Sequence, residues 1–500
     1  MANVLLRASA LVVAAFALAL LYMRLPESVA RTDRPLCERC NVILISFDTV
    51  RADHVGSYGY ERATTPNVDA LAAKSIVFER AIAQAPWTLP SHAAMLSGLY
   101  PSRLGVLHYP ASRVLSDQNT VLPEVFRAAG YATAGFTGGG FVSEHYGFNR
   151  GFDIYATRGR HYEHNIDTTL EWIDDHKRSP FFLFFHGYDA HRPYYSKPAD
   201  KTEMGLPADA ESEQSHFCLR DDREDTNSDR RDKIVRYYDA AIHHGDRGIG
   251  VLLEALERMH LMENTVILLT SDHGEEFFEH GHCDHVRFLY NESLHVPYMI
   301  YLPGQTVSAR RIPGLIPASI SVARTVLDIV GIEHAMPGVT LLPMIEGKQK
   351  AFPVVYSEAD SAPGQLSSRG RSIAITKNEI KLISYTDEGT DEAYNLVEDP
   401  GEKNPLPEKN AAYLMRQTLR EWADALRPLP RPAVELDDAT KAAAMDDEDS
   451  TGNGEREDDD GSAPSGKDAA KTSGKAKPGA KRDKMPEELK KDLKSLGYLQ

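Results

Sequence analysis

The chain has 500 residues, of which 42% are hydrophobic and 26% are charged, which is the composition of a globular protein with one large and one smaller domain. The formal net charge is -17, but twelve acidic residues between Glu435 and Asp460, against only Lys441 and Arg456, account for -10 of it. The remainder is mildly acidic, which argues against a nucleic-acid partner.

An apolar segment stands near the start of the chain. Residues 8–23 are uncharged, with Arg7 before them and Arg24 after them. A membrane span takes about 20 residues, so this shorter segment fits a signal peptide cleaved after Ala30, with an uncleaved membrane anchor as the alternative. Both alternatives predict a periplasmic or otherwise extracytoplasmic protein, secreted or anchored by this segment.

Apolar runs alternate with helical periodicity from residue 42 onward. In chain order, the sequence predicts strand 42–47, helix 66–74, strand 76–78, helix 92–97, helix 122–129, strand 131–136, helix 168–176, strand 180–186, helix 233–259 and strand 265–270. This alternation is typical of a doubly wound α/β fold, with a mostly parallel sheet and helices on both faces. Weaker strands follow at 296–301 and 353–357.

Strand-like runs at 371–376 and 379–384 and a helix near 411–426 predict a smaller C-terminal α+β subdomain. A long stretch after it has almost no large apolar residues, which is typical of disorder. The organisation we predict is a signal peptide or anchor at 1–30, a linker at 31–40, a main domain at 41–349, the subdomain at 350–430, a disordered acidic-then-basic insert at 431–483 and a helical tail at 484–500.

Cys37 and Cys40 form a Cys-x-x-Cys pair directly before the first predicted strand. The sequence leaves three interpretations open: a disulfide in an oxidising compartment, half of a metal clip, or two thiols without a role. The chain has no second pair of this kind, which argues against structural zinc. Cys218 and Cys283 lie in polar, loop-like sequence, and we expect no role for them.

Metal-binding residue types follow two of the predicted buried strands directly. Asp48 comes after NVILISF, and Asp272 and His273 come after NTVILLTS. Ligands gather outside the carboxyl ends of parallel strands, although a carboxylate there can also cap the next helix. Aspartate and histidine together offer oxygen and nitrogen donors, which suit zinc or manganese better than calcium.

Thr88 opens a helix-like stretch in the segment APWTLPSHAAMLSG. It can simply be the N-cap of that helix. A helix N-terminus also favours a bound tetrahedral anion, and a metal ion makes a hydroxyl a usable nucleophile. Ser91 and His92 follow three and four residues later and can face the same oxyanion.

Four segments, taken together, form a specific set of sequence motifs: NVILISFDTVRADHVGSYGY, TTPNVDALA, WTLPSHAAMLSGLYPSRLGV and TSDHGEEFFEHG. Two later stretches, LHVPYMIYLPG and YNLVEDPGEKNPL, agree with them. Together they resemble the sulfatase family, which is part of the alkaline-phosphatase-like superfamily. The resemblance covers about residues 41–428 and implies a metal-dependent hydrolase of sulfate or phosphate esters.

The nucleophile segment departs from the family pattern. Sulfatases carry Cys- or Ser-x-Pro-Ser-Arg, in which the Cys or Ser is oxidised to formylglycine, whereas this chain runs from Thr88 to His92 as Thr-Leu-Pro-Ser-His. Threonine cannot become that aldehyde. A threonine nucleophile on a zinc- or manganese-type site resembles the phosphodiesterases, phosphonate hydrolases and phosphoethanolamine transferases of the superfamily.

The resemblance also implies roles for residues at the other motif positions. The divalent cation, zinc or manganese rather than calcium, is held by Asp48, Thr88, Asp272 and His273. Thr88 attacks sulfur or phosphorus, Arg51 and His92 counter the charge of the oxyanion, and His191 or His285 protonates the leaving oxygen. His285 stands where the family has the lysine of a later loop.

Further polar residues are weaker candidates. Asp189, His191 and His285 are a candidate second metal site, and Glu275 and Glu276 are expected to be solvated or to lie beside the ligands. The remaining candidates are His186, His280, His282 and Asp284.

We therefore expect a sulfatase-like hydrolase that cleaves a small or glycan-borne anionic ester, with no nucleic-acid partner and with membrane association if the N-terminal segment is retained. A phosphoethanolamine-type transferase is one alternative, although such enzymes usually have several hydrophobic segments. A catalytically silent binding protein with the same fold is the other.

Overall fold

The computed structural model of the chain describes residues 35–109, 114–210, 228–304, 308–361, 369–408 and 410–426. The predicted signal peptide or anchor, the acidic-then-basic insert and the helical tail all lie outside these residues. Within the described part of the chain, no helix combines the length and apolar character that a membrane span needs.

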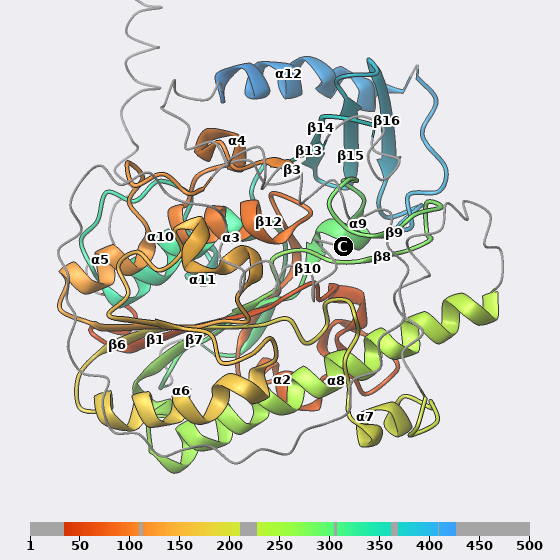
Figure 1. Cartoon of the computed structure of the whole chain (residues 1–500). Coiled ribbons are helices and arrows are strands. Elements are labelled where there is room, and N and C mark those ends of the chain that lie inside the picture. The colour runs from red at the N-terminus through yellow and green to blue at the C-terminus, as the bar shows by residue number, and fades with distance from the viewer. Residues whose placement is uncertain are drawn as a thin grey trace, which may run out of the picture.

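A nine-stranded, mostly parallel sheet forms the centre of the fold (Figure 1). Strand β1 runs parallel to β6 on one side and to β7 on the other, and β4 and β5 continue the sheet beyond β6. Strand β11 is antiparallel to both β7 and β2, and β12 pairs parallel with β2. The strands are β1 (Asn41–Phe47), β2 (Ile76–Ile82), β4 (Ala132–Phe136), β5 (Ile154–Ala156), β6 (Phe181–Gly187), β7 (Thr265–Thr270), β10 (His295–Val296), β11 (Tyr298–Tyr301) and β12 (Arg310–Pro317).

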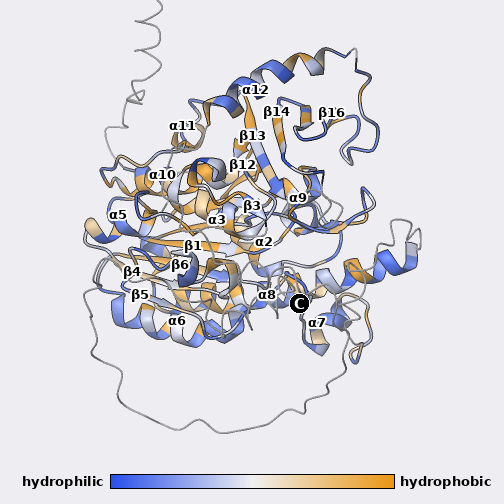
Figure 2. Cartoon of the chain, turned by 45° about the horizontal axis from the view of Figure 1, so that its top comes forward, coloured by the Kyte–Doolittle hydropathy of each residue, from blue (hydrophilic) through white to orange (hydrophobic). Residues whose placement is uncertain are grey.

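Helices cover both faces of this sheet, as the alternation of strand and helix predicts (Figure 1). Because side chains alternate across a strand, Val42 and Leu44 of β1 enter the hydrophobic core on one face, and Ile43 and Ile45 enter the core on the other. Figure 2 shows the apolar residues concentrated on the central strands. The first face carries α3 (Thr88–Ser97), α5 (Leu122–Ala128) and α10 (Ala318–Val330), and the second carries α2 (Pro66–Ala72), α6 (Tyr162–His176) and α8 (Ser228–Arg258).

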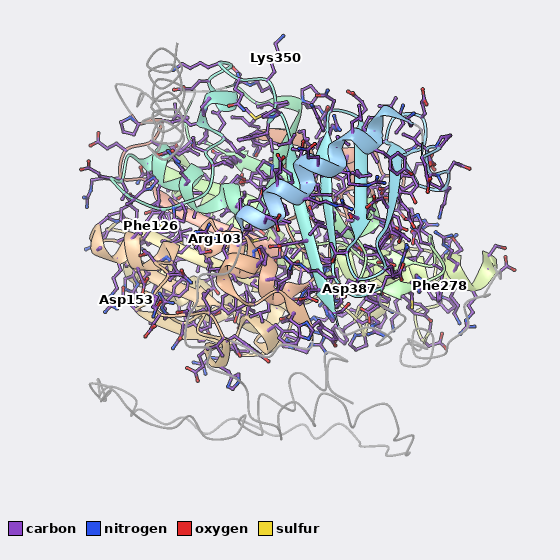
Figure 3. The ribbon with its side chains drawn as sticks, turned by 90° about the horizontal axis from the view of Figure 1, so that it is seen from above. Arg103, Phe126, Asp153, Phe278, Lys350 and Asp387 are labelled. Atoms are coloured by element: carbon purple, nitrogen blue, oxygen red, sulfur yellow. A yellow bond between two sulfur atoms is a disulfide. The ribbon has the colours of Figure 1, made fainter. Side chains whose placement is uncertain are left out.

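The predicted α+β subdomain is present at the C-terminal side. Its antiparallel strands are β13 (Val355–Ser361), β14 (Ser372–Lys377), β15 (Ile380–Tyr385) and β16 (Thr390–Asn395), with β3 (His108–Tyr109) added parallel to β13. Helix α12 (Met415–Ala425) lies across this sheet (Figure 3) and stacks Trp422 on Tyr356 at 4.3 Å between ring centroids. Lys381 of β15 makes a buried ion pair of 3.0 Å with Glu402.

Short elements complete the described chain and correct some predicted bounds. The helix expected at 92–97 begins at Thr88, and the helix expected at 168–176 begins at Tyr162. Strand β2 extends to Ile82. The remaining short elements include α4 (Pro101–Leu104), α7 (Pro198–Glu203), β8 (Glu276–Phe277), β9 (Cys283–Asp284), α9 (Asn291–Leu294) and α11 (Leu342–Ile345).

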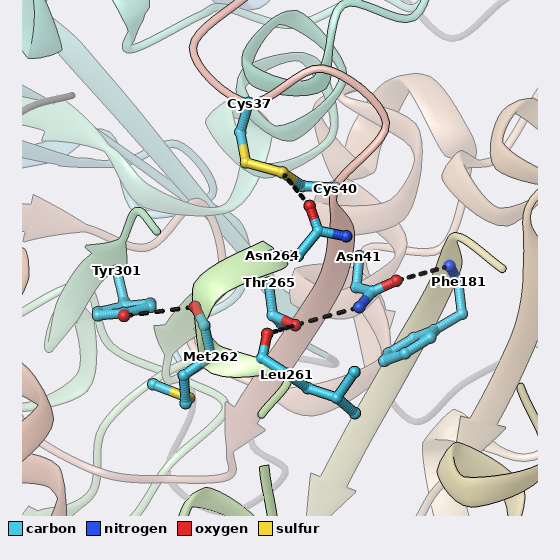
Figure 4. Close-up of a disulfide and its surroundings, with 9 residues drawn as sticks. All are labelled: Cys37, Cys40, Asn41, Phe181, Leu261, Met262, Asn264, Thr265 and Tyr301. Atoms are coloured by element: carbon cyan, nitrogen blue, oxygen red, sulfur yellow. Dashed lines mark hydrogen bonds between the residues drawn. A yellow bond between two sulfur atoms is a disulfide. The ribbon is translucent and has the colours of Figure 1, made fainter. Parts of the chain in front are cut away.

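Cys37 and Cys40 are joined by a disulfide, which decides between the three interpretations of the pair (Figure 4). The disulfide precedes β1, so it lies at the amino end of the central strand. There Asn41 bridges the neighbouring strands, donating to Thr265 Oγ1 at 3.2 Å and accepting from the Phe181 amide at 3.3 Å. Cys283 is disulfide-bonded as well, so the expectation that it has no role is wrong.

Candidate active site

The predicted metal ligands lie at the carboxyl ends of two adjacent parallel strands. Asp48 follows β1, and Asp272 and His273 follow β7 after one intervening residue. The register that pairs Ser46 with Thr270 brings these ends side by side. Thr88 is the first residue of α3, which packs on the face of the sheet above them (Figure 1).

All four side chains are completely buried and close together. Thr88 Oγ1 lies 3.4 Å from His273 Nε2, which in turn lies 3.2 Å from Asp272 Oδ2. Asp48, Asp272 and His273 each offer one ligand atom, and these three atoms lie within 4.8 Å of one another. The structure therefore brings together the four residues that the sequence analysis assigns to the cation.

The hydrogen bonds of His273 decide which ring nitrogen is available. Its Nδ1 lies 2.8 Å from the carbonyl oxygen of Gly274, which can only accept, so Nδ1 carries the proton. The lone pair of Nε2 then faces Thr88. Burial lowers the pKa of His273 to about 4, so the ring is neutral near pH 7, the form that binds a metal.

The two carboxylates face each other with oxygens that lack donors. Among the described residues, Asp48 Oδ1 and Asp272 Oδ2 have no hydrogen-bond partner. Burial and the neighbouring Asp272 raise the pKa of Asp48 well above its usual range. Burial would raise the pKa of Asp272 as well, but the nearby imidazoles of His273 and His92 outweigh it and lower that pKa.

This donor set fits a divalent cation. Two buried carboxylates side by side repel each other unless a proton or a cation lies between them. The orphaned oxygens, the neutral Nε2 of His273 and the Thr88 hydroxyl supply mixed oxygen and nitrogen donors, which suit a zinc- or manganese-type ion. The sulfur ligands typical of structural zinc sites are absent from this set.

His186 supports Asp48 from the adjacent strand β6. Its Nδ1 accepts the Gly138 amide at 3.3 Å, so the proton is on Nε2, which donates to Asp48 Oδ2 at 3.1 Å. From the sequence, His186 is a candidate site residue without an assigned role. Its position opposite Ser46 in the β1–β6 register is the signal that would have linked it to Asp48.

The two residues expected to counter oxyanion charge are both engaged by the protein. His92 has its Nε2 2.8 Å from Ser46 Oγ and its Nδ1 2.9 Å from the Thr88 carbonyl oxygen. The Arg51 guanidinium binds Asp53 and Glu279, each at 2.7 Å. The structure places His92 within the cluster and Arg51 in a separate ion-pair group, and their charge-countering role stays a prediction.

His285 and His191 line up beside His273. The ring centroids of His285 and His273 are 4.4 Å apart, and those of His285 and His191 are 5.0 Å apart. His285 Nδ1 lies 2.9 Å from Asp284 and 3.1 Å from Glu275. Burial alone would lower the pKa of His285, but these two carboxylates raise it to about 10, so this imidazole is a cation near pH 7.

His191 differs from its neighbour in charge. Its Nδ1 donates to the Arg192 carbonyl oxygen at 2.6 Å, and burial together with the His285 cation lowers its pKa well below the usual range. His191 is therefore neutral near pH 7.

The remaining candidate site residues do not all lie beside the predicted cation ligands. From the sequence, Glu275 and Glu276 are expected to be solvated or to lie beside the ligands, and both are buried, which leaves the second alternative. His280 binds Glu292 and stacks on Tyr290, away from the cation ligands. Asp189, which the sequence suggests for a second metal site with His191 and His285, lies instead beside His161 and His244.

Comparison with known proteins identifies the architecture. The profile of the family described as Sulfatase matches residues 40–332, and that of the N-sulphoglucosamine sulphohydrolase C-terminal family matches residues 278–427. The chain belongs to the sulfatase family. It is a sulfatase-type ester hydrolase, as the motifs and the alkaline-phosphatase-like fold predict.

Relatives of this sulfatase are themselves sulfatases by their names. An endo-4-O-sulfatase of Bacteroides thetaiotaomicron is 25% identical over 492 residues, covering 81% of this chain and 95% of the relative. The human iduronate 2-sulfatase is 26% identical over 335 residues, covering 54% of this chain and 60% of the relative.

Solved structures share the fold of this sulfatase. One, described as a complex with its substrate D-glucosamine-2-N,6-O-disulfate, has a TM-score of 0.65 at 22% identity and covers 78% of this chain and 97% of its own. A phosphonate monoester hydrolase of Agrobacterium radiobacter has a TM-score of 0.57 at 19% identity and covers 79% of this chain and 95% of its own. Sulfatases generally use a divalent metal, and the residues above fit one.

Proposed function

We propose that this sulfatase cleaves a sulfate ester carried by a glycan, with Thr88 as the nucleophile and with Asp48, Thr88, Asp272 and His273 holding a divalent cation. One observation carries the proposal: Thr88 Oγ1 lies 3.4 Å from His273 Nε2, beside two buried carboxylates with orphaned oxygens. The sugar in the name of the relative iduronate 2-sulfatase, and the sulfated glucosamine substrate of a protein that shares the fold, support the substrate class.

The chain's own residues account for the bonds that form and break. Thr88 gives up its hydroxyl proton to solvent and Oγ1 attacks the sulfur, so that the new O–S bond forms and the S–O bond to the sugar breaks. The leaving sugar oxygen takes a proton, and water then attacks the sulfur of the threonine adduct, which releases sulfate and restores the hydroxyl. A divalent cation bound at this place would lower the pKa of the Thr88 hydroxyl and offset negative charge on the ester oxygens.

We assign the proton for the leaving oxygen to His285. It is the protonated member of the histidine pair, because Asp284 and Glu275 hold its Nδ1, whereas His191 is neutral. A group that starts protonated can donate at once, and general acids of this kind typically contribute about 10²–10⁴-fold in rate.

A phosphate ester is the second candidate substrate. The presence of Thr88 favours it, because a threonine adduct must be cleaved by water, without the aldehyde that sulfatases form at this position. A phosphonate monoester hydrolase is among the proteins that share the fold. A transferase that passes the same adduct to an alcohol is the related alternative.

We also propose that the protein works outside the cytoplasm. The Cys37–Cys40 disulfide and the disulfide-bonded Cys283 support this, because disulfides persist in oxidising compartments.

The test is turnover of matched esters by the purified full chain. An aryl sulfate, a glycan sulfate, a phosphate monoester and a phosphodiester are compared at fixed Zn²⁺ or Mn²⁺, with Thr88→Ala as the control. We expect the highest kcat/KM on a sulfate ester and a trapped covalent adduct on Thr88 by mass spectrometry. A higher kcat/KM on phosphate esters would identify a phosphate ester as the substrate. Transfer of the adduct to an added alcohol would favour the transferase. Equal turnover by Thr88→Ala would show that Thr88 is not the nucleophile.

A further inference from the structure

A second cluster of metal-ligating side chains lies outside the proposed active site. It joins three elements: His161 and Glu163 at the start of α6, Asp189 in the loop after β6, and His244 in α8. Asp189 Oδ1 is nearly equidistant from His161 Nδ1, at 3.8 Å, and His244 Nε2, at 3.9 Å. Glu163 Oε1 lies 3.4 Å from the same nitrogen of His244.

The atoms that face one another here lack partners. Among the residues that the structure describes, Asp189 Oδ1, His161 Nδ1 and His244 Nε2 have no hydrogen bond. The three residues are 0%, 8% and 3% exposed, so bulk water does not satisfy them. Leaving a buried polar atom unpaired costs about 1–3 kcal/mol, and three such atoms that face one another are placed to share one bound ligand.

The distances from Asp189 to His161 and His244 suit a ligand bound between these side chains better than direct hydrogen bonds. Distances of 3.8 and 3.9 Å are too long for hydrogen bonds between the groups. Ligand atoms around a tetrahedral zinc ion, each about 2.0–2.1 Å from the metal, lie about 3.4 Å apart. The three unpartnered atoms lie farther apart than this, so one ion would reach all of them only after the side chains of His161 and His244 move toward each other.

The surroundings of His244 match those of a metal-binding histidine. Its Nδ1 lies 3.2 Å from Asp200 Oδ2, and a metal ion on Nε2 selects the tautomer in which Nδ1–H donates to this carboxylate. Arg247 also lies 3.1 Å from Nδ1, but it has a second partner in Asp200 Oδ1, at 3.2 Å from its Nε. Glu163 uses its other oxygen for Lys197, which leaves Oε1 toward the cluster.

We propose that His161, Asp189 and His244, with Glu163 beside them, form a second divalent-cation site of the zinc type. Two imidazoles and carboxylate oxygens are a donor set that zinc accepts. A water molecule fits less well, because it can donate only two hydrogen bonds, whereas the carboxylate oxygen and two ring lone pairs are three acceptors.

The role we infer is structural. Asp189 lies two residues before His191, in the loop that carries this histidine toward the active site, and its other oxygen accepts the Tyr162 amide at 3.0 Å. A bound ion would tie this loop to α6 and α8 and so fix the position of His191.

The test counts metal ions in a chain whose active-site ligands are removed. The full chain carrying Asp48→Asn and Asp272→Asn is titrated with Co²⁺ alone, and the visible absorption of the bound ion is recorded. We expect about one equivalent to bind with the intense bands of tetrahedral coordination. Absence of a saturable one-equivalent signal would overturn the proposal, and this arm does not depend on how the cluster variants fold.

Cluster variants then locate the ion. His161→Gln or His244→Gln in the same background should weaken Co²⁺ binding at least about tenfold. His176→Gln, at the other end of α6, is the matched control and should leave binding unchanged. Unchanged binding in both cluster variants would overturn the assignment. Because the active-site carboxylates are already removed, neither result depends on whether the proposed catalytic function is right.

Discussion

His186 donates from Nε2 to Asp48 Oδ2 across 3.1 Å while its Nδ1 accepts the Gly138 amide. This pair of bonds holds the Asp48 carboxylate in one orientation and leaves Oδ1 as the oxygen without a donor among the described residues. His186 is thus a positioning residue for Asp48, which we propose as a cation ligand, and both ring nitrogens of His186 are already used.

The first prediction concerns this hydrogen bond. His186→Phe removes the donor to Asp48, and we expect the affinity for the active-site Zn²⁺ or Mn²⁺ to fall about 10–100-fold, the usual effect of losing a group that orients a ligand. His186→Gln, which keeps an N–H donor, should lose less. The dissociation constant is measured by competition with a chromophoric chelator.

The matched control for His186 is His176→Ala. His176 ends α6, where its Nδ1 lies 2.8 Å from the Trp172 carbonyl oxygen, and it takes no part in the cluster. Its loss should leave the metal affinity unchanged. A His186→Phe protein that binds metal as tightly as the unmodified chain would contradict the positioning role.

The second prediction concerns Thr88. Thr88→Ala should lower kcat by at least about 10³-fold, because no other group replaces the nucleophile. Thr88→Ser keeps a hydroxyl on the same carbon and should retain measurable turnover and the covalent adduct. Rapid-quench mass spectrometry of the two variants provides the measurement. Adduct formation at another residue in Thr88→Ala would refute the assignment.

The third prediction uses the leaving group to test His285. Loss of its proton in His285→Ala should lower kcat about 10²–10⁴-fold for a sugar ester, whose leaving oxygen needs protonation. An aryl ester with a nitro-substituted ring leaves as a stable anion and should lose much less. His285→Lys restores a cation and should recover part of the activity.

Equal losses of kcat on the sugar and aryl esters in His285→Ala would mean that His285 does not deliver the proton. In that case His191, whose ring centroid lies 5.0 Å from that of His285, is the residue to test next by the same comparison.

The fourth prediction concerns stability against pH. Glu358 of β13 is buried, accepts the Ser102 amide at 2.8 Å with one oxygen, and has no partner within the described chain for the other. Burial raises its pKa from 4.5 to about 7. Between about pH 4.5 and 7, Glu358 is therefore protonated in the folded protein but ionised in the unfolded chain. The free energy of unfolding consequently falls as the pH rises through this window, and Glu358 causes no further change above it.

Glu358→Gln should remove this dependence. The free energy of unfolding is measured by urea titration at pH 5 and at pH 8. The contribution of Glu358 to its decrease between these two pH values, up to about 3 kcal/mol in the unmodified chain, should be absent in the variant. Glu398→Gln, an exposed substitution, is the control and should not change the dependence. An identical pH dependence in Glu358→Gln would show that this carboxyl does not take up a proton on folding.

The sequence by itself predicted the central sheet and marked the four residues that we propose as cation ligands. The apolar runs before Asp48 and Asp272 are long enough to be buried parallel strands, and the carboxyl ends of parallel strands meet at one edge. Local patterns also gave the C-terminal subdomain, and the family motifs marked Thr88. Element ends were less certain: the sequence pattern started α3 at residue 92, whereas the helix begins at Thr88.

Only the tertiary structure decided which polar groups meet across long distances in the chain. The pairing of His186 with Asp48 depends on the β1–β6 register, and the meeting of Asp189 with His244 depends on how α8 packs against the sheet. The same holds for the charge of His285, which follows from Asp284 and Glu275 lying against one nitrogen. Hydrophobic periodicity predicts which face of an element is buried, but hydrogen-bond partners and pKa values depend on distances of a few ångströms that packing alone determines.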